Sequence, residues 1–424
     1  MSGAGAGPDR APRSVLVMRT AMVGKLLPLA FVVLAVGIST ALFHPFLALF
    51  LSTEVAAGPV RVTAFLIAAP LAGVIAAALI ARLSDRRAIR RGLLITAALT
   101  GCAGSVLSAY VRNYWVLLGL AVTAFALAGS LFPQTFAYAR QVLQRDDPAR
   151  ATMGISSMRT VFSIAWVAGP PLAAVLLEAG GFRYVYGTAA AMYLFAALVA
   201  IFWLERLGPV PAPEARPREP HGVSSRGSLI LIATAFTLLQ CPLTLGAQAL
   251  PLFVSRVLGG EVSAAGLLLG LCAALEIPLM LAFGVLAARI PIRRLILAGA
   301  GCGVAYYAIV TAASGVGVLY PAQLINALFI AAVTGLGITY VQDLLPAEPG
   351  RATTLFTNTF PIGSMLAGPM FGLAQNFGFR WAYAISTALC LGGLLVLMSV
   401  PRPAGPALRG DDSRPSTQRW RSRS

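Results

Sequence analysis

The chain has 424 residues, of which 58% are hydrophobic and only 11% are charged, and its mean hydropathy is +0.80. Because soluble domains carry about 25% charged residues, this composition excludes a single water-facing globule. The net charge of +17 would suit a nucleic-acid partner, but the basic residues lie in short loops between apolar runs, so no nucleic-acid binding is expected.

Long apolar runs predict membrane-spanning helices, since about 20 residues at roughly 1.5 Å per residue cross the hydrocarbon layer. The twelve predicted spans are residues 26–51, 62–81, 92–110, 114–139, 152–178, 183–204, 229–255, 263–288, 292–313, 318–342, 352–375 and 379–400. The first run is too long for a signal peptide and is predicted to remain as the first span. The expected fold class is an all-α membrane protein with twelve transmembrane helices in two six-helix lobes.

A break rich in Pro and Arg at residues 205–228 separates six spans from six. Such a segment cannot form a packed core and is predicted to be a cytoplasmic linker. The expected organisation is a cytoplasmic N-terminal tail (1–25), an N-terminal six-helix lobe (26–204), the linker (205–228), a C-terminal six-helix lobe (229–400) and a disordered basic C-terminal tail (401–424).

Both termini are predicted to be cytoplasmic, because Lys and Arg concentrate in the cytoplasmic loops of membrane proteins. With this orientation most of the 32 basic residues fall on the cytoplasmic side. The exceptions on the far side are Arg61, Arg112, Arg183, Arg256 and Arg380. We therefore expect a multi-pass protein of the cytoplasmic (inner) membrane, surrounded by the lipid bilayer and working as a monomer.

The two halves of the chain resemble each other in four ordered places. The pairs are Ile89-Arg90-Arg91 with Ile292-Arg293-Arg294, Arg150-Ala151-Thr152 with Arg351-Ala352-Thr353, Ala168-Gly169-Pro170 with Ala367-Gly368-Pro369, and Gly181-Phe182-Arg183 with Gly378-Phe379-Arg380. Their nearly constant spacing predicts a parallel duplication of a six-span unit, which is the arrangement of two-lobed secondary transporters.

No catalytic constellation is visible along the chain. The two histidines, His44 and His221, have no suitable Ser, Cys or metal-ligand grouping, and the five cysteines lie in apolar runs without a C-x-x-C pair. No phosphate-binding G-x-x-x-x-G-K-[ST] loop occurs. The sequence therefore predicts no enzyme, no cofactor and no metal site, with energy taken from an ion gradient, the solute gradient or a partner.

Charged residues at membrane depth are costly and mark functional sites. Glu276, near the middle of the eighth span, is predicted either to accept substrate hydroxyls or carry a proton, or to form a structural pair. Arg159 shares one helical face with Ser163, Trp166 and Pro170. That face either presents a cation and an aromatic ring to the interior, or Arg159 extends to the cytoplasmic interface.

Sugars are bound by amides and carboxylates at their hydroxyls and by an aromatic face at the ring. The candidate amides are Gln240, Gln248, Gln323, Asn326 and Asn358. Each is expected to contact substrate or, alternatively, to join helices by hydrogen bonds. His44-Pro45 predicts a kink in the first span, with His44 as a titratable group or a hydrogen-bonded structural residue.

The loop between the second and third spans contains Asp85 and Arg86, followed by Arg90 and Arg91. It loosely resembles the major facilitator signature Gly-x-x-x-Asp-Arg-x-Gly-Arg-Arg, with Ala81 and Ala88 at the two glycine positions and the arginine pair one residue late. We expect a cytoplasmic charge latch in which an Arg or a helix N-terminus holds Asp85. The alternative is positive charge that sets topology only.

Several strings together resemble the sugar efflux transporter family of the major facilitator superfamily. They are Met158-Arg159, Ser163-Ile164-Ala165-Trp166-Val167-Ala168-Gly169-Pro170-Pro171-Leu172, Leu275-Glu276-Ile277-Pro278, Gln342-Asp343-Leu344 and Ala352-Thr353-Thr354-Leu355-Phe356-Thr357-Asn358. The resemblance covers about residues 26–400. Phe43-His44-Pro45 departs from it, because smaller or amide residues precede this proline in the family.

This resemblance implies the major facilitator fold and export of sugars or small glycosides, with protons as the expected counter-substrate. It also places Gln342 and Asp343 among the polar positions of the family, and Asp343 is expected to act in coupling or gating. The first alternative is a drug or amphipathic-metabolite exporter of the same fold, which a cavity lined by Phe, Met and Leu with few amides would favour. A membrane receptor or assembly subunit that transports nothing is the second alternative.

Overall fold

A computed structural model of the protein describes residues 11–86, 89–146, 151–205, 226–346 and 348–400. Its elements are α1 (Ala11–Phe43), α2 (Leu47–Thr53), α3 (Pro59–Arg86), α4 (Arg90–Tyr110), α5 (Tyr114–Leu120), η1 (Ala121–Phe125), α6 (Ala126–Ala128), α7 (Leu131–Asp146), α8 (Ala151–Phe202), α9 (Arg226–Arg256), α10 (Val262–Ala287), α11 (Ile292–Ala312), η2 (Val316–Val318), α12 (Leu319–Leu344), α13 (Pro349–Thr357), α14 (Thr359–Phe377) and α15 (Arg380–Ser399). Every regular element in these ranges is a helix, which confirms the predicted all-helical class.

Ten helical stretches of the described chain are long and apolar enough to cross a membrane. One of them, Ser157–Phe202, holds the fifth and sixth predicted spans. The two spans are separated by a break in α8 at Gly180 and Gly181. Gly181 has a φ of 67°, which glycine adopts without the steric cost of a Cβ. The eleventh predicted span is divided between α13 and α14. The first span is likewise divided between α1 and α2, and the fourth among α5, η1, α6 and α7. The helices are thus compatible with the twelve predicted spans.

Two breaks interrupt helices of the N-terminal half near one another. The first separates α1 from α2 at His44-Pro45, where proline supplies no N–H to the helix ladder, and this confirms the predicted kink. The second is the π-helical turn η1, which no sequence signal predicted. The rings of Phe43 and Phe125 contact each other at a centroid distance of 5.3 Å, so the two breaks face one another.

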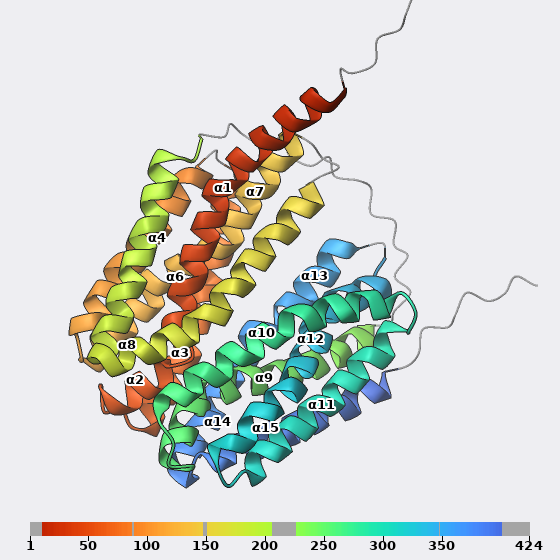
Figure 1. Ribbon diagram of the computed structural model, residues 1–424. Coiled ribbons are helices and arrows are strands. Elements are labelled where there is room, and N and C mark those ends of the chain that lie inside the picture. The colour runs from red at the N-terminus through yellow and green to blue at the C-terminus, as the bar shows by residue number, and fades with distance from the viewer. Residues whose placement is uncertain (1–10, 87–88, 147–150, 206–225, 347, 401–424) are drawn as a thin grey trace, which may run out of the picture.

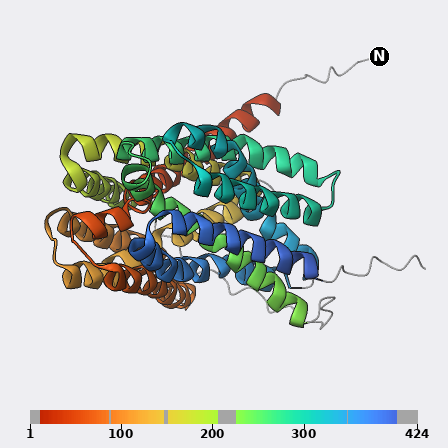
Figure 2. The same ribbon diagram turned by 90° about the horizontal axis from the view of Figure 1, so that it is seen from below.

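The helices form two halves. In the N-terminal half, α1 and α4 pack along α8, and in the C-terminal half α9, α11, α12 and α15 pack together. Figure 1 and Figure 2 show the red-to-yellow helices gathered on one side and the teal-to-blue helices on the other. This arrangement agrees with the two-lobed fold expected from the repeated strings.

One end of the molecule, here called the arginine-rich end, carries Arg90, Arg91, Arg289, Arg293 and Arg351. There, Arg91 donates to the carbonyls of Ala200 and Ile201 at the end of α8. Arg293 donates to the carbonyls of Leu397, Met398 and Val400 at the end of α15. Both arginines thus cap the last helix of their half. The sequence repeat pairs Arg90, not Arg91, with Arg293. The capping residue is therefore displaced by one position between the two halves.

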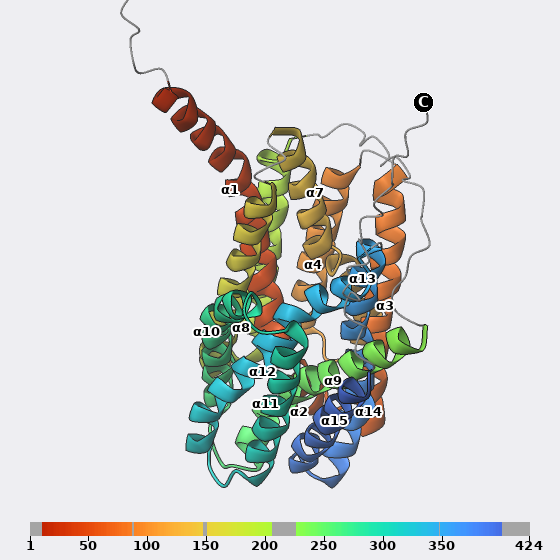
Figure 3. The same cartoon turned by 90° about the vertical axis from the view of Figure 1, so that its right-hand side faces the viewer.

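The halves touch near the opposite end, where glycines let helices approach closely. A Cβ at Gly266 would lie 2.5 Å from the Pro170 carbonyl oxygen of α8. On the other side of the molecule, the Thr63 hydroxyl of α3 donates to the Gly368 carbonyl of α14 at 3.3 Å. Figure 1 shows the halves meeting near α2 and diverging toward the arginine-rich end, and Figure 3, viewed from the side, shows α4 and α7 extending above α11 and α15.

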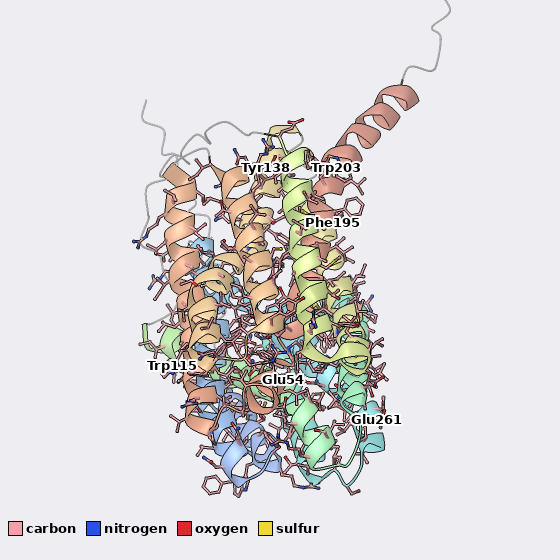
Figure 4. The ribbon with its side chains drawn as sticks, turned by 90° about the vertical axis from the view of Figure 1, so that its left-hand side faces the viewer. Glu54, Trp115, Tyr138, Phe195, Trp203 and Glu261 are labelled. Atoms are coloured by element: carbon pink, nitrogen blue, oxygen red, sulfur yellow. The ribbon has the colours of Figure 1, made fainter. Side chains whose placement is uncertain are left out.

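Aromatic rings accompany every arginine that was predicted on the far side. The pairs are Arg61 with Tyr114, Arg112 with Phe50, Arg183 with Tyr110, Arg256 with Phe379 and Arg380 with Phe253, at 4.5–6.0 Å from guanidinium carbon to ring centre. Exposed Trp203 lies at the arginine-rich end, and exposed Trp115 lies toward the opposite end, as Figure 4 shows. Tryptophans at two levels are typical of the two membrane interfaces.

Candidate functional site

A cavity of about 400 Å³ lies between the two halves. We call it the central cavity. The N-terminal half contributes His44, Phe162, Ser163 and Trp166, and the C-terminal half contributes most of the polar groups, including Gln240, Thr244, Glu276, Tyr306 and Asn326. Its volume and its mixture of apolar walls with a few converging polar groups are typical of small-molecule sites.

A second cavity of about 550 Å³ adjoins the first on the side of the N-terminal half. We call it the aromatic cavity, because its lining includes Phe43, Phe50, Phe65, Phe125, Phe132, Tyr186 and Tyr193. The two cavities share four lining residues, His44, Phe162, Thr244 and Phe360. These four residues therefore form the boundary between a polar and an aromatic space.

His44 owes its position to the break between α1 and α2. Its side chain lines both cavities, and its ring lies 6.5 Å from the ring of Trp166 at an interplanar angle of 72°. Trp166 and Ser163 come from α8 and also line the central cavity. Arg159, one turn earlier on the same face, is exposed and lines neither cavity. Of the predicted face, Ser163 and Trp166 therefore reach the central cavity and Arg159 does not.

Glu276 projects from the middle of α10 into the central cavity. Within the described chain, no Lys, Arg or His nitrogen lies within 4.0 Å of its carboxylate, and Arg159 is therefore not its partner. A carboxylate at this depth without a cation requires water, a proton or a ligand in the cavity to offset its desolvation. The geometry leaves the carboxylate available to solutes.

Gln240 and Gln248 lie two helical turns apart on α9. Gln240 is 2% exposed and lines the central cavity, yet neither its amide oxygen nor its nitrogen has a hydrogen-bond partner. Gln248 lines the aromatic cavity, and its Oε1 is likewise unpartnered. Buried polar atoms are rarely left without partners in native proteins, so both side chains are suited to bind a ligand that the cavities admit.

Gln323 and Asn326 occupy adjacent positions on one face of α12. The Asn326 Nδ2 donates to Gln323 Oε1 at 3.2 Å and to Cys272 Sγ at 3.3 Å, and Gln323 Nε2 donates to the Tyr306 hydroxyl at 3.3 Å. Asn326 lines the central cavity, whereas Gln323 is 1% exposed and does not. The structure therefore brings one of the two predicted amides to the solute and places the other behind it.

Other predicted residues lie away from both cavities. Asn358 is exposed at the junction of α13 and α14, and Asp343 is exposed near the end of α12. Arg90 donates to the Ala137 carbonyl and to Gln141 Oε1 on α7, and Arg91 caps α8 as described above. The side chains of Asp85 and Arg86 are outside the described part of the structure. The proposed charge latch therefore remains a prediction.

Sequence reasoning missed several lining residues. Thr244 lies midway between Gln240 and Gln248, so a step of four along α9 would have identified it. Its hydroxyl lies 3.0 Å from the Ser364 hydroxyl of α14. Tyr306 and Phe360 carried no comparable signal, because an aromatic residue in an apolar run looks the same whether it faces lipid, core or cavity. Across the described ranges no group of three or more His, Cys, Asp or Glu is placed to hold a metal ion.

Comparisons with known proteins identify the family of the chain. The sequence profile of the family described as Major Facilitator Superfamily matches residues 29–320 and 247–423. The chain is 34% identical to sugar efflux transporter A of Dickeya chrysanthemi, over 88% of this chain and 95% of the relative. It is 33% identical to sugar efflux transporter A of Escherichia coli, over 89% and 97%, and 32% identical to sugar efflux transporter C of the same organism, over 85% and 91%.

Solved structures support the fold at much lower sequence identity. A mutant of the nucleoside transporter NupG superposes with a TM-score of 0.74 at 14% identity, covering 89% of this chain and all of that one. A bacterial homolog of the human lysosomal transporter Spinster superposes with a TM-score of 0.75 at 13% identity, covering 93% and 98%. The family profile, the relatives and the shared fold together assign the chain to the major facilitator superfamily and, within it, to the sugar efflux transporters.

Proposed function

We propose that this transporter exports sugars or small glycosides across the cytoplasmic membrane. The observation that carries the proposal is the polar wall of the central cavity, where Gln240, Glu276 and Asn326 converge from three helices opposite Trp166. Amide and carboxylate groups suit the hydroxyls of a sugar, and the indole ring offers a flat apolar surface to the sugar ring. The names of the relatives support the same substrate class.

We further propose that transport occurs by alternating access, with the arginine-rich end facing the cytoplasm. In support, the close contacts of α8 with α10 and of α3 with α14 lie toward the opposite end. Residues beyond the central cavity toward the arginine-rich end, including Arg159 and Thr357, are exposed. The conformation described here then corresponds to a carrier that is open to the cytoplasm and closed to the outside.

Protons are the proposed counter-substrate, and Glu276 is the proposed carrier. A carboxylate accepts hydrogen bonds when it is ionised and becomes a donor when it is protonated. A sugar hydroxyl and a proton would therefore compete for the same oxygen atoms, which is the requirement for exchange of one for the other. Glu276 suits this role because it faces the cavity and, within the described chain, has no cation to neutralise it.

We also propose an assembly state and domain boundaries. Both halves supply walls of one central cavity, so a single chain can hold a complete path, and we propose a monomer. The proposed lobes are residues 26–204 and 229–400, with the linker (205–228), the N-terminal tail (1–25) and the C-terminal tail (401–424) in the cytoplasm. Residues 1–10 of the N-terminal tail, residues 206–225 of the linker and the whole C-terminal tail lie outside the described residues, whereas residues 11–25 belong to α1 and α9 begins at Arg226.

The direct test is accumulation of a radiolabelled, non-metabolised methyl glycoside in cells with and without the protein. We expect cells that contain the protein to accumulate less, and cells with Glu276→Gln to resemble cells without it. Unchanged accumulation across a panel of methyl glucosides and galactosides would reject sugar export. Full pH-driven exchange by Glu276→Gln in proteoliposomes would instead reject only the proton-carrying role.

The aromatic cavity supports export of amphipathic metabolites or drugs as a second candidate function. Its walls combine seven Phe and two Tyr side chains with small and aliphatic residues, and Gln248 is the one amide among its lining residues. Competition separates the two functions. If the carrier is primarily an amphipath exporter, a lipophilic cation or dye should be exported and should readily displace any bound glycoside. For a sugar exporter, methyl glycoside export should saturate and the dye should not be exported.

A further inference from the structure

The relay of Tyr306, Gln323 and Asn326 in the wall of the central cavity determines which atom of Asn326 the solute meets. Both N–H groups of the Asn326 amide are in use, one toward Gln323 Oε1 and one toward Cys272 Sγ. Its carbonyl oxygen Oδ1 is buried and has no partner, although the residue lines the cavity. In this arrangement Asn326 can only accept a hydrogen bond from a solute.

The reverse orientation of the relay is less favourable. If both amides were turned over, Gln323 would donate to Asn326 and accept from the Tyr306 hydroxyl. Both N–H groups of Asn326 would then be left without partners, instead of one carbonyl oxygen. Orphaned buried N–H groups are rarer in proteins than carbonyls with unused acceptor capacity, so the hydrogen-bond network favours the observed orientation.

Gln323 anchors this orientation although it does not reach the cavity. It is 1% exposed, its oxygen receives the Asn326 N–H, and its nitrogen is held by Tyr306. Removing the Tyr306 oxygen would leave Gln323 Nε2 free to turn toward Asn326, and the Asn326 amide would then be able to turn as well. The orientation of Asn326 therefore depends on a hydroxyl two residues away in the relay.

We propose that Gln323 and Tyr306 are positioning residues that hold Asn326 Oδ1 toward the central cavity as a dedicated acceptor for one hydroxyl group of the sugar. The inference rests on the proposed function and specifies how this site recognises its substrate. Glu276, one helical turn after Cys272 on α10, offers acceptor oxygens in the same cavity. The polar wall thus selects substrates that donate hydrogen bonds from adjacent positions.

The test uses the purified full chain in detergent and measures binding by calorimetry. The probes are methyl β-D-glucopyranoside, methyl β-D-galactopyranoside and the derivatives of each in which a single hydroxyl is replaced by fluorine. Fluorine cannot donate a hydrogen bond but is close to the hydroxyl in size. For the unaltered protein, the fluorine at one ring position should weaken binding by about 5-fold, the effect of one neutral hydrogen bond.

Four variants locate the effect. Asn326→Leu should abolish the difference between hydroxyl and fluorine at that position, and Asn326→Asp should restore it, because a carboxylate is still an acceptor. Tyr306→Phe should reduce the difference to about 2-fold or less while Asn326 itself stays unaltered. Tyr307→Phe is the matched control, since its hydroxyl lies beside the same cavity but donates to the Pro242 carbonyl outside the relay.

The outcomes distinguish failure of the proposed sugar function from failure of the proposed relay. If neither parent glycoside binds to the unaltered protein, the proposed sugar function is overturned, and this inference falls with it. If the parents bind but the fluorine effect is absent, or persists unchanged in Asn326→Leu and Tyr306→Phe, the relay is overturned and the proposed function stands. If Asn326→Leu fails to fold, the comparison of Tyr306→Phe with Tyr307→Phe decides the question. The melting temperature of each variant shows whether it is folded.

Discussion

The two walls of the central region come from duplicated halves but differ in chemistry. The C-terminal wall carries Gln240, Thr244, Glu276 and Asn326, whereas the lining residues of the N-terminal wall include several Phe and Tyr and no amide or carboxylate. The sequence separation between Phe50 and Phe253 also relates Gly37 to Gln240, Ala41 to Thr244 and Gly73 to Glu276. Small residues on one side therefore stand where polar side chains stand on the other.

The framework around these walls has diverged much less. Phe50 contacts Tyr186 at a centroid distance of 5.0 Å, and its counterpart Phe253 contacts Tyr383 at 4.6 Å. The caps of Arg91 and Arg293 are also equivalent. The comparison indicates that the duplication preserved the packing of each half and left the cavity positions free to specialise, with recognition of polar groups concentrated in the C-terminal half.

The strongest test of this asymmetry compares one titratable residue from each wall. Glu276→Gln should lower proton-driven export by about 10-fold to 100-fold, because a hydrogen bond to a charged group contributes about 1.5–3 kcal/mol. His44→Asn, on the opposite wall, should lower it by no more than about 5-fold. Initial rates in proteoliposomes with an imposed pH gradient measure both. Equal losses would mean that coupling is shared between the halves.

The second prediction concerns the contact on which both walls depend. Gly266→Val should disturb the packing of α10 on α8, because a Cβ at Gly266 would lie 2.5 Å from the Pro170 carbonyl oxygen. We expect the population closed at the opposite end to fall, with transport reduced by about 10-fold. Distance measurements between spin labels on α3 and α14 report this population.

Gly284 provides the control for that experiment. It lies on the same helix, α10, and a Cβ there would meet no atom within 4 Å. Gly284→Val should therefore leave the distance distribution and the transport rate near their original values. A similar loss in both variants would attribute the effect to helix propensity and not to the contact between halves.

The third prediction separates binding from stability on the polar wall. Because neither amide atom of Gln240 has a partner, Gln240→Met should leave the melting temperature unchanged or raise it, since a buried unsatisfied group is removed. Glycoside affinity should nevertheless fall by about 5-fold. If the melting temperature falls and affinity does not, Gln240 joins helices and does not bind the solute.

The smallest effect on simple sugars is expected on the aromatic wall. Phe132 lines only the aromatic cavity, where its ring lies 4.4 Å from that of Phe162. Phe132→Leu should change the affinity for methyl glycosides by less than about 2-fold, because the central cavity is intact. A large loss, measured by the same calorimetry, would show that the sugar itself occupies the aromatic cavity.

Most of the fold was predictable because a bilayer imposes length and apolarity on every span. The apolar runs located the helices, and Pro45 located the break in the first span. The π-helical turn η1 was not predictable, because Ala121–Phe125 is an ordinary apolar segment and the extra residue is accommodated only through packing. The break between the fifth and sixth spans depends on non-helical backbone angles at Gly180 and Gly181.

The candidate site was predictable only where a polar residue is costly in its surroundings. That criterion selected Glu276, Gln240 and Asn326, which all line the central cavity. It could not show that Gln323 lies behind Asn326. Both amides are on α12, and only the rotation of that helix about its axis decides which of them faces the solute. Asn358 lies at a helix junction, where exposure removes the cost that made it a candidate.

The π-helical turn also limits how this chain can change in length. Such a turn holds one residue more than an α-helical turn, so it absorbs that residue without changing the direction of the side chains that follow in the fourth span. Deleting one residue from Ala121–Phe125 would restore a regular α-helical turn and leave the face of α7 in place. Deleting a second residue would rotate α7 by about 100°, and Tyr138 would turn away from the Glu205 carbonyl, to which it donates at 2.7 Å. Homologous chains can therefore lack one residue here and keep the same face on α7, and a one-residue gap in an alignment belongs inside this turn.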